Sequence, residues 1–288
     1  MLTSSKNSAV IDIGGGWRIR PVAGFHCDAL KRICHSINDY EEKDSVISLK
    51  STPDKKVLLQ TAQPEPFLIK THLHLSFGNR LKASLRYFAG REKRKTDLLR
   101  EFENTRLAHK LGVPTSKMYG YGIKFINGFA RQEMLLSNGK SNSMPLIEIL
   151  KKQAENEKEI EKILQRTFNL ISRMLKAGYV HLDLHSDNIL LSDSGSGQDI
   201  IIDHEFGSLF PDNKMVEVAA FVFGYLYRCQ VREYLSFERY AAIVKQVLPS
   251  LTLLTKGQLQ FSPDFEKLFF FAATKRVPKK KRNHYLRL

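Results

Sequence analysis

Three polar side chains suited to metal binding and proton transfer are concentrated in one short stretch of the chain. Asp183 and Asn188 lie five residues apart in the segment HLDLHSDN, and Asp203 follows the isoleucine run at 200–202. Carboxylate and amide oxygens are the ligands that Mg²⁺ prefers in proteins, and a further carboxylate can accept the proton of a hydroxyl group. The pattern therefore predicts a magnesium site formed by Asn188 and Asp203, with Asp183 as the proton acceptor.

Two short apolar runs are predicted to bring these side chains together. NILLS (188–192) and DIIID (199–203) have the composition of strands and are separated by the flexible segment DSGSGQ. We expect them to pair as a hairpin, which would place Asn188 and Asp203 at neighbouring strand ends. A long predicted helix ends at Gly178, a good C-cap, so Asp183 lies in the loop between this helix and the hairpin.

The first half of the chain is predicted to form a small antiparallel sheet with helices. Asn127-Gly128 is the expected turn of a hairpin over 120–136, because this dipeptide favours the positive φ angles of a type I′ turn. The polar segment 137–145 is the expected boundary between two lobes. Strands are predicted at 46–50, 57–61 and 66–72, a turn at 51–56, and helices at 80–88, 92–111, 145–153, 157–178 and within 214–260.

A lysine and a glutamate precede the acidic stretch in the order that kinases use. Lys70 ends the strand segment FLIK, and Glu101 lies on the following predicted helix, with Glu103 as the alternative. Order, spacing and context together resemble the kinase-like superfamily over about residues 45–245, most specifically over 178–205. The resemblance implies an α+β, bilobal protein-kinase-like fold with a β-rich N-lobe and a mainly helical C-lobe.

Within this superfamily the chain differs from eukaryotic protein kinases. The metal-binding segment reads Asp203-His204-Glu205 in place of D-F-G, His185 stands where those enzymes carry a lysine, and no A-P-E segment follows. The pattern D-x-H-x-x-N followed by I-D-x-E resembles the kinases of aminoglycosides, choline and sugars. The basic helices before Arg100 and the segment GVPTSKMYGYG are most similar to the bacterial lipopolysaccharide core kinases, which phosphorylate Kdo or heptose.

The resemblance implies a role for each matching residue, with ATP and Mg²⁺ as cofactors and a sugar or glycolipid as acceptor. It divides the chain into an N-lobe with an N-terminal extension at 1–137 and a C-lobe at 138–288. Asp183 would be the base or would orient the hydroxyl group, His185 would steady the γ-phosphate, and Asn188 and Asp203 would bind Mg²⁺. The nucleotide phosphates would be held by Lys70, paired with Glu101, and the adenine by the backbone from Glu133 to Leu135. Ser51, Thr52 and Lys55 would contact phosphates in place of a glycine-rich loop. Glu205 would contact a second metal or the catalytic loop.

The basic charge of the chain favours anionic partners. The formal net charge is +15; residues 70–117 contain twelve basic and four acidic residues, and 275–288 contain seven basic residues and no acidic one. The aromatic run at 265–273 precedes this tail, a pattern that suits an anionic membrane surface, although a localisation signal or a nucleic-acid arm has the same pattern. We expect the tail to bind the membrane, and its deletion to spare the active site.

Composition favours a soluble intracellular protein, and the resemblance implies a cytoplasmic protein that is peripheral on the inner face of the cytoplasmic membrane. The chain has three cysteines, no signal-peptide pattern at its N-terminus and no apolar run of the ~20 residues that span a bilayer. The glycines at 14–16 form either a nucleotide loop or a plain turn, and the turn is favoured. The pairs His26-Cys27 and Cys34-His35 suit either zinc or an ordinary amphipathic helix, and the helix is favoured.

Two classes of function are compatible with these features. One is an ATP-dependent kinase of a sugar or glycolipid, with a protein kinase or another small-molecule kinase as the near alternative. The other is a catalytically inactive kinase-like scaffold that binds membrane or nucleic acid. A polyanion binder gains nothing from converging carboxylates, so the kinase is preferred and no nucleic-acid partner is expected.

Overall fold

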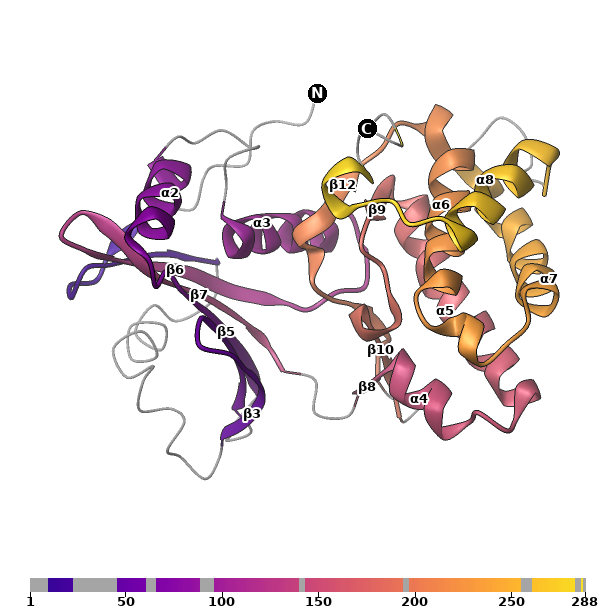
Figure 1. Ribbon diagram of the computed structural model, residues 1–288, viewed down its shortest axis with the longest axis horizontal. Helices are drawn as coiled ribbons and strands as arrows, with labels where there is room; N and C mark the ends of the chain where they lie inside the picture. The colour runs from indigo at the N-terminus through magenta and orange to yellow at the C-terminus, as the bar shows by residue number, and fades with distance from the viewer. Residues whose placement is uncertain are drawn as a thin grey trace. The chain divides into compact units, whose positions relative to one another are not determined.

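The chain divides into two compact units of different architecture. The computed structural model describes residues 10–22, 46–60, 66–88, 96–139, 143–193, 197–254, 261–282 and 286. One unit comprises Met1–Arg106 and Ser116–Ser141, and the other comprises Leu107–Thr115 and Asn142–Leu288. The first is built on a large sheet and the second mainly on helices (Figure 1), which confirms the predicted α+β class. The candidate zinc residues at 26–35 lie outside the described residues.

A seven-stranded antiparallel sheet forms the framework of the first unit. Its strand order is β1-β2-β6-β7-β5-β4-β3. The predicted hairpin is formed by β6 and β7, and Asn127 and Gly128 take φ angles of 51° and 78°, as a type I′ turn requires. The strands are β1 (Ile11–Asp12), β2 (Trp17–Pro21), β3 (Val46–Ser51), β4 (Lys55–Gln60), β5 (Phe67–Leu73), β6 (Met118–Ile126) and β7 (Phe129–Asn138).

The glycines at 14–16 form the turn that joins β1 to β2. The backbone N–H of Trp17 donates to the carbonyl oxygen of Gly14 at 3.1 Å. Gly16 has a φ of 80°, and a Cβ atom there would lie 2.1 Å from the carbonyl oxygen of Phe125. The segment is thus a turn between two strands, and the close approach at Gly16 requires a glycine there. The turn lets the only tryptophan of the chain enter the core of the sheet, where it is 1% exposed.

Within the described residues of this unit, two helices accompany the sheet, α2 (Phe77–Phe88) and α3 (Asp97–Lys110). The hydroxyl group of Thr96 accepts a hydrogen bond from the N–H of Leu99 at 3.4 Å, so α3 begins later than the predicted start at 92. Its end follows the prediction, because Gly112 takes a φ of 78° just after the last turn.

The helices of the second unit surround one large apolar core. Buried residues on α5 recur at Leu164, Phe168, Ile171 and Leu175, the spacing of a single helix face. The ring of Phe168 packs against that of Phe223 on α6, with centroids 5.1 Å apart. The helices are α4 (Leu146–Lys152), α5 (Glu157–Lys176), α6 (Met215–Arg228), α7 (Phe237–Val247) and α8 (Pro263–Thr274).

Gly224 allows α6 and α8 to pack closely, and its replacement tests that contact. A Cβ atom on Gly224 would lie 2.4 Å from the carbonyl oxygen of Phe269 and 2.8 Å from the Cβ of Ala272. We expect Gly224→Ala to lower the free energy of unfolding by about 1–3 kcal/mol through overpacking, measured by denaturant unfolding. Gly78 on α2 has open space around the added atom, so Gly78→Ala should stabilise by up to about 1 kcal/mol. Equal effects of the two changes would contradict the close packing.

Short strands and 3₁₀ turns position the polar residues of the second unit. The predicted hairpin is present: Ile189 pairs with Ile201 and Leu190 with Ile200. These elements are β8 (Ser143–Pro145), β9 (Tyr179–His181), η3 (Ser186–Asn188), β10 (Ile189–Ser192), β11 (Ile200–Ile201), η4 (His204–Phe206) and β12 (Gly207–Leu209).

Candidate active site

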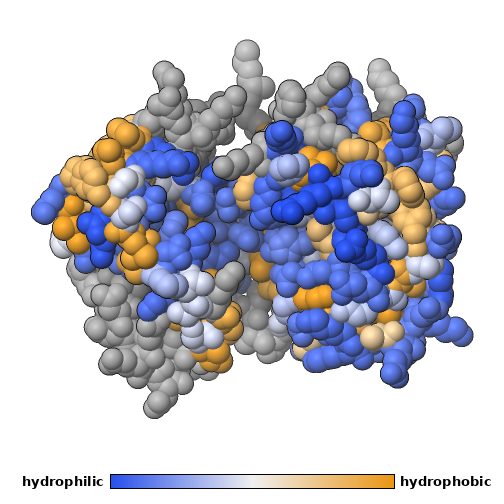
Figure 2. Space-filling model, viewed as in Figure 1, coloured by the Kyte–Doolittle hydropathy of each residue, from blue (hydrophilic) through white to orange (hydrophobic). Residues whose placement is uncertain are grey.

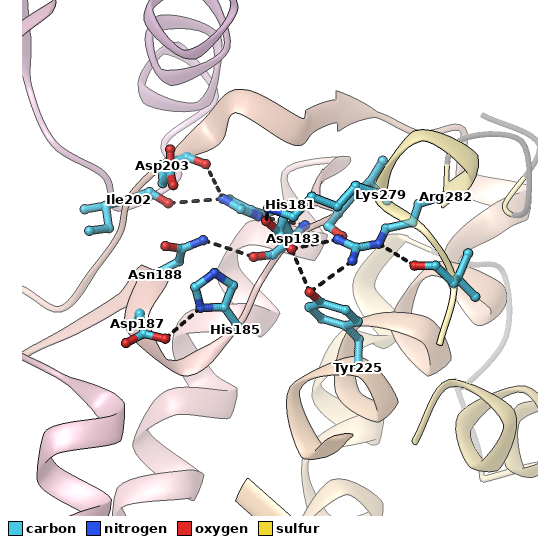
Figure 3. A network of polar contacts seen from close by, with 12 residues as sticks. His181, Asp183, His185, Asp187, Asn188, Ile202, Asp203, Tyr225, Lys279 and Arg282 are labelled. Atoms are coloured by element: carbon cyan, nitrogen blue, oxygen red, sulfur yellow. Dashed lines mark hydrogen bonds and ion pairs between the residues drawn. The ribbon is translucent and has the colours of Figure 1, made fainter. Parts of the chain in front are cut away.

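The hairpin of β10 and β11 brings Asn188 and Asp203 to neighbouring strand ends. The N–H of Ile202 donates to the backbone carbonyl oxygen of Asn188 at 2.9 Å, which closes the hairpin at this end. The Asn188 side chain donates through Nδ2 to the carbonyl oxygen of Asp183 at 3.0 Å. Its Oδ1 atom is turned away from Asp183 (Figure 3), which suits it to a cation.

Asp203 has an unusual backbone conformation that presents its side chain at the end of β11. Its φ and ψ are 61° and 48°, in the left-handed region that few residues other than glycine adopt. Aspartate and asparagine tolerate this region better than most residues, and such conformations are common at functional sites.

A buried histidine holds the backbones of Asp183 and Asp203 together. The Nε2 atom of His181 lies 3.1 Å from the carbonyl oxygen of Ile202 and 2.8 Å from that of Asp203. Since carbonyl oxygens only accept, Nε2 carries the proton, and Nδ1 accepts from the N–H of Asp183 at 3.2 Å. Burial lowers the pKa of His181, although both aspartates oppose this, so the neutral ring that these bonds need is favoured.

The Asp183 side chain, 5% exposed, is surrounded by donors. Oδ1 accepts from the hydroxyl group of Tyr225 at 2.6 Å and from Nη1 of Arg282 at 2.7 Å, and Oδ2 pairs with the ammonium group of Lys279 (Figure 3). Burial raises the pKa of Asp183, but the hydrogen bonds from Lys279, Tyr225 and Arg282 outweigh it and lower the pKa to about 2. The group is therefore an ionised hydrogen-bond acceptor at neutral pH.

His185 lies beside this loop. Its Nδ1 atom is 3.0 Å from Oδ2 of Asp187, and its backbone N–H donates to the carbonyl oxygen of Asp183 at 2.9 Å. The ring is thus oriented by a neighbouring carboxylate within the same loop.

In the first unit, the ion pair expected between Lys70 and Glu101 is present. The Nζ atom of Lys70 on β5 lies 2.6 Å from Oε1 of Glu101 on α3, and the two side chains are mostly buried. Glu103, the alternative, instead pairs with Nη1 of Arg20 at 3.3 Å. The helical spacing explains the difference, because two residues along a helix rotate the side-chain direction by about 200°, to the opposite face.

Comparison with known proteins identifies the type of site. Residues 77–208 match the model of the "Lipopolysaccharide kinase (Kdo/WaaP) family". This segment, just under half of the chain, includes Glu101, Asp183, Asn188 and Asp203. Over residues 77–208 the chain is similar to the lipopolysaccharide kinases of this family. It is a kinase, and its acceptor class is a sugar of the lipopolysaccharide core.

A solved structure and a search of curated proteins complete the comparison. The structure described as "WaaP in complex with acyl carrier protein" is 13% identical, covers 93% of this chain and 92% of that chain, and has a TM-score of 0.45. A search of curated proteins found no match.

The expected adenine contact of this kinase is wrong for Glu133 and Leu135. Both lie in the middle of β7, which is hydrogen-bonded to β5 on one side and to β6 on the other, so their backbone groups face neighbouring strands. The buried Glu133 carboxylate accepts from Thr96 at 2.6 Å and from Tyr121 at 3.0 Å, and lies 2.6 Å from Nε2 of His74. It is satisfied within the sheet and cannot meet a nucleotide.

His72, His74 and Glu133 offer a second grouping of possible metal ligands, whose atoms lie within 4.8 Å of one another. They line a cavity of about 150 Å³ that Lys82 and Arg86 also line. Two extra cations oppose metal binding there, and Glu133 is already paired, so this grouping is best explained as part of the buried support of the sheet.

The connection between β3 and β4 is a self-contained turn. The hydroxyl group of Thr52 donates to Oδ1 of Asp54 at 3.0 Å and accepts from the N–H of Lys55 at 3.1 Å. Ser51 is the last residue of β3 and is exposed. Thr52 is thus engaged within the turn, which leaves Ser51 and Lys55 as the better candidates for phosphate contact.

The basic tail is not the free segment that its composition predicted. Lys279 and Arg282 contact Asp183, and Arg282 is buried. The expectation that deletion of 275–288 spares the active site is therefore wrong. A buried carboxylate needs cationic or hydrogen-bonding partners, and a count of charges does not reveal which basic residue supplies them.

Four residues of the site carried no prediction. His181 had a local signal, since it stands two residues before Asp183 in the H-x-D pattern. Tyr225, Lys279 and Arg282 lie far along the chain and have no comparable signal. The residues that sequence reasoning missed are His181, Tyr225, Lys279 and Arg282.

Proposed function

We propose that the chain transfers the γ-phosphoryl group of ATP to a hydroxyl group of Kdo or heptose in the lipopolysaccharide core. The observation that supports this most is the grouping of Asp183, Asn188 and Asp203, held by one hairpin and one histidine. An amide oxygen, a metal-binding carboxylate and a hydroxyl-binding carboxylate are the parts that phosphoryl transfer to an alcohol uses.

Asn188 and Asp203 would hold Mg²⁺. The donor set fits this ion, because Mg²⁺ prefers carboxylate and amide oxygens and the Asn188 nitrogen is committed to the Asp183 carbonyl group. The ion would neutralise phosphate charge. His181 contributes indirectly, since it fixes the backbone on both sides of the site.

Asp183 would orient the acceptor hydroxyl group. A carboxyl group with a pKa of about 2 stays ionised and accepts a strong hydrogen bond, but it takes a proton only late in the transfer. Lys70, steadied by Glu101, would bind the ATP phosphates, with Ser51 and Lys55 as further contacts. His185 would contact the γ-phosphate, and Glu205 would support the metal or the loop.

We propose that the nucleotide-holding residues lie in 1–137 and that the acceptor-binding and metal-binding residues lie in 138–288.

The function is tested by incubating the full-length protein with Mg²⁺ and γ-labelled ATP. Kdo-containing and heptose-containing glycolipids are the acceptors, with casein and an aminoglycoside as alternative acceptors. Label in a glycolipid alone is expected. Label in casein alone, or in no acceptor, would overturn the proposal.

The peripheral location is proposed from α2, the basic amphipathic helix, in place of the tail. None of the described helices is long and apolar enough to cross a membrane. The helix has no acidic residue, and Figure 2 shows apolar residues gathered where it lies. Basic and apolar residues on one helix suit an anionic lipid surface. The exposed apolar residues are Phe77 (62%), Leu81 (40%), Leu85 (62%) and Phe88 (60%), and the basic ones are Arg80, Lys82 and Arg86.

Charge substitution on this helix face tests the membrane proposal. We expect Leu81→Glu with Leu85→Glu to weaken binding to phosphatidylglycerol vesicles by about tenfold or more, since two membrane-buried leucines are lost and two negative charges are added. Co-sedimentation gives the bound fraction. Ile47→Glu, at an apolar site on β3 whose exposure (50%) lies between those of the two leucines, is the matched control and should bind normally. Unchanged binding of the double variant would contradict the proposal.

A further inference from the structure

The two oxygens of the Asp183 carboxylate are held in different ways. Oδ1 accepts from Tyr225 at 2.6 Å and from Arg282 at 2.7 Å, whereas Oδ2 is paired with Lys279 (Figure 3). The Arg282 side chain is 5% exposed and the Lys279 side chain 52% exposed. One oxygen is thus held by buried groups and the other by a group that reaches solvent.

The Arg282 guanidinium group makes several hydrogen bonds besides the one to Asp183. Beyond Asp183 its guanidinium group donates to the carbonyl oxygens of Leu182 at 2.6 Å and Val277 at 3.1 Å, and to the Tyr225 oxygen at 3.1 Å. It also lies 4.4 Å from the centroid of the Tyr225 ring. A planar guanidinium group with this many directed bonds determines the orientation of its acceptor.

Lys279 has fewer partners and is more exposed than Arg282. Its ammonium group contacts Oδ2 and lies 5.2 Å from the centroid of the Phe206 ring. An ammonium group on a flexible side chain has no strict directional preference, so a competing donor can displace it. A hydroxyl group that donates to Oδ2 would occupy the position that Lys279 now holds.

We propose that Arg282, together with Tyr225, is a positioning residue that fixes Asp183 through Oδ1, and that Lys279 covers Oδ2 until the acceptor hydroxyl group displaces it. The inference rests on the proposed function, in which Asp183 binds that hydroxyl group. It assigns Oδ2 as the acceptor-binding atom and makes the segment 277–282 part of the active site.

The groups around the Asp183 carboxylate come from β9, α6 and the segment 277–282. Buried His181 on β9 accepts from the backbone N–H of Asp183, and Tyr225 comes from α6. Burial and the hydrogen bond to Asp183 raise the pKa of Tyr225, so it remains a donor. The charged or titratable groups near the carboxylate are His181, Asp203, Tyr225, Arg228, Cys229, Lys279 and Arg282.

Kinetics of Arg282 variants test the positioning role. We expect Arg282→Gln to lower kcat by about 100-fold, the effect of a misplaced reacting group, with the KM for ATP unchanged. Arg282→Lys should restore part of the rate. Arg276→Gln, at the exposed arginine just before the segment 277–282, is the matched control and should behave as wild type. A kcat for Arg282→Gln equal to that of the control would overturn the proposal.

Lys279→Met tests the displacement. Removing the competing ammonium group should lower the KM for the acceptor by about threefold or more, because the acceptor no longer breaks an ion pair to bind. A raised KM would mean that Lys279 binds the acceptor directly, and would overturn the displacement.

A measurement that needs no acceptor separates this inference from the proposed function. In protein labelled with carbon-13 at aspartate Cγ, the Asp183 signal is assigned by its loss in Asp183→Asn. We expect Arg282→Gln to shift this signal at neutral pH, because Oδ1 loses the guanidinium donor that lies 2.7 Å away, whereas Arg276→Gln should leave it unchanged. A shifted signal in Arg282→Gln, without phosphorylation of any glycolipid by wild type, would retain the contact and reject the proposed acceptor. An unchanged signal would reject the positioning role itself.

Discussion

Replacing Asp203 with asparagine is expected to abolish Mg²⁺-dependent ATP binding and to lower turnover by roughly 10³-fold or more, equivalent to about 4 kcal/mol of transition-state stabilisation. The change removes a negative charge but keeps the size of the side chain. Asparagine also tolerates the φ of 61° at this position, and the carbonyl group bound by His181 is untouched. The loss should therefore be one of metal binding and not of folding.

Calorimetry of Mg²⁺-ATP binding measures this effect directly. Asp193→Asn is the matched control, since Asp193 is an exposed aspartate of the connection after β10, and it should bind as wild type does. Full Mg²⁺-dependent binding by Asp203→Asn would show that the metal assignment is wrong. Absence of binding by wild type would favour the inactive scaffold.

Replacing Asp183 with asparagine should lower kcat by about 10²–10⁴-fold while Mg²⁺-ATP binding persists, because a charged acceptor for the hydroxyl group is lost. The amide that Asp183→Asn introduces would be a neutral partner for two cations, so the free energy of unfolding should also fall. Single-turnover phosphorylation and nucleotide calorimetry on the same sample separate the two steps. Loss of nucleotide binding together with turnover would contradict an acceptor-side role.

The parts of the fold that local patterns specify could be predicted from sequence. The pairing of β10 with β11 follows from two apolar runs joined by a flexible segment, and it places Asn188 and Asp203 at neighbouring strand ends. The Asn127-Gly128 turn has a strong preference of its own. Lys70 and Glu101 were found from the order of the elements and not from any property of either residue.

The errors have physical reasons as well. Strand composition does not show where along β7 a residue lies, so Glu133 was placed at an adenine when it is paired on both sides. Basic residues in a run have no periodicity that tells a buried arginine from an exposed one, which is why Arg282 was missed. The exposed face of α2 depends on what the helix leaves uncovered, and that is a property of tertiary packing.

The hydrogen bond between Asp183 and Arg282 joins residues 99 positions apart in the sequence, so it closes a long loop when the chain folds. Contacts between distant parts of a chain carry a large loop-closure entropy and tend to form late. Local opening of the segment around Arg282 would require less free energy than global unfolding. Hydrogen exchange should then detect a sub-global state in which the helical core is protected while the hydrogen bond between Asp183 and Arg282 is broken.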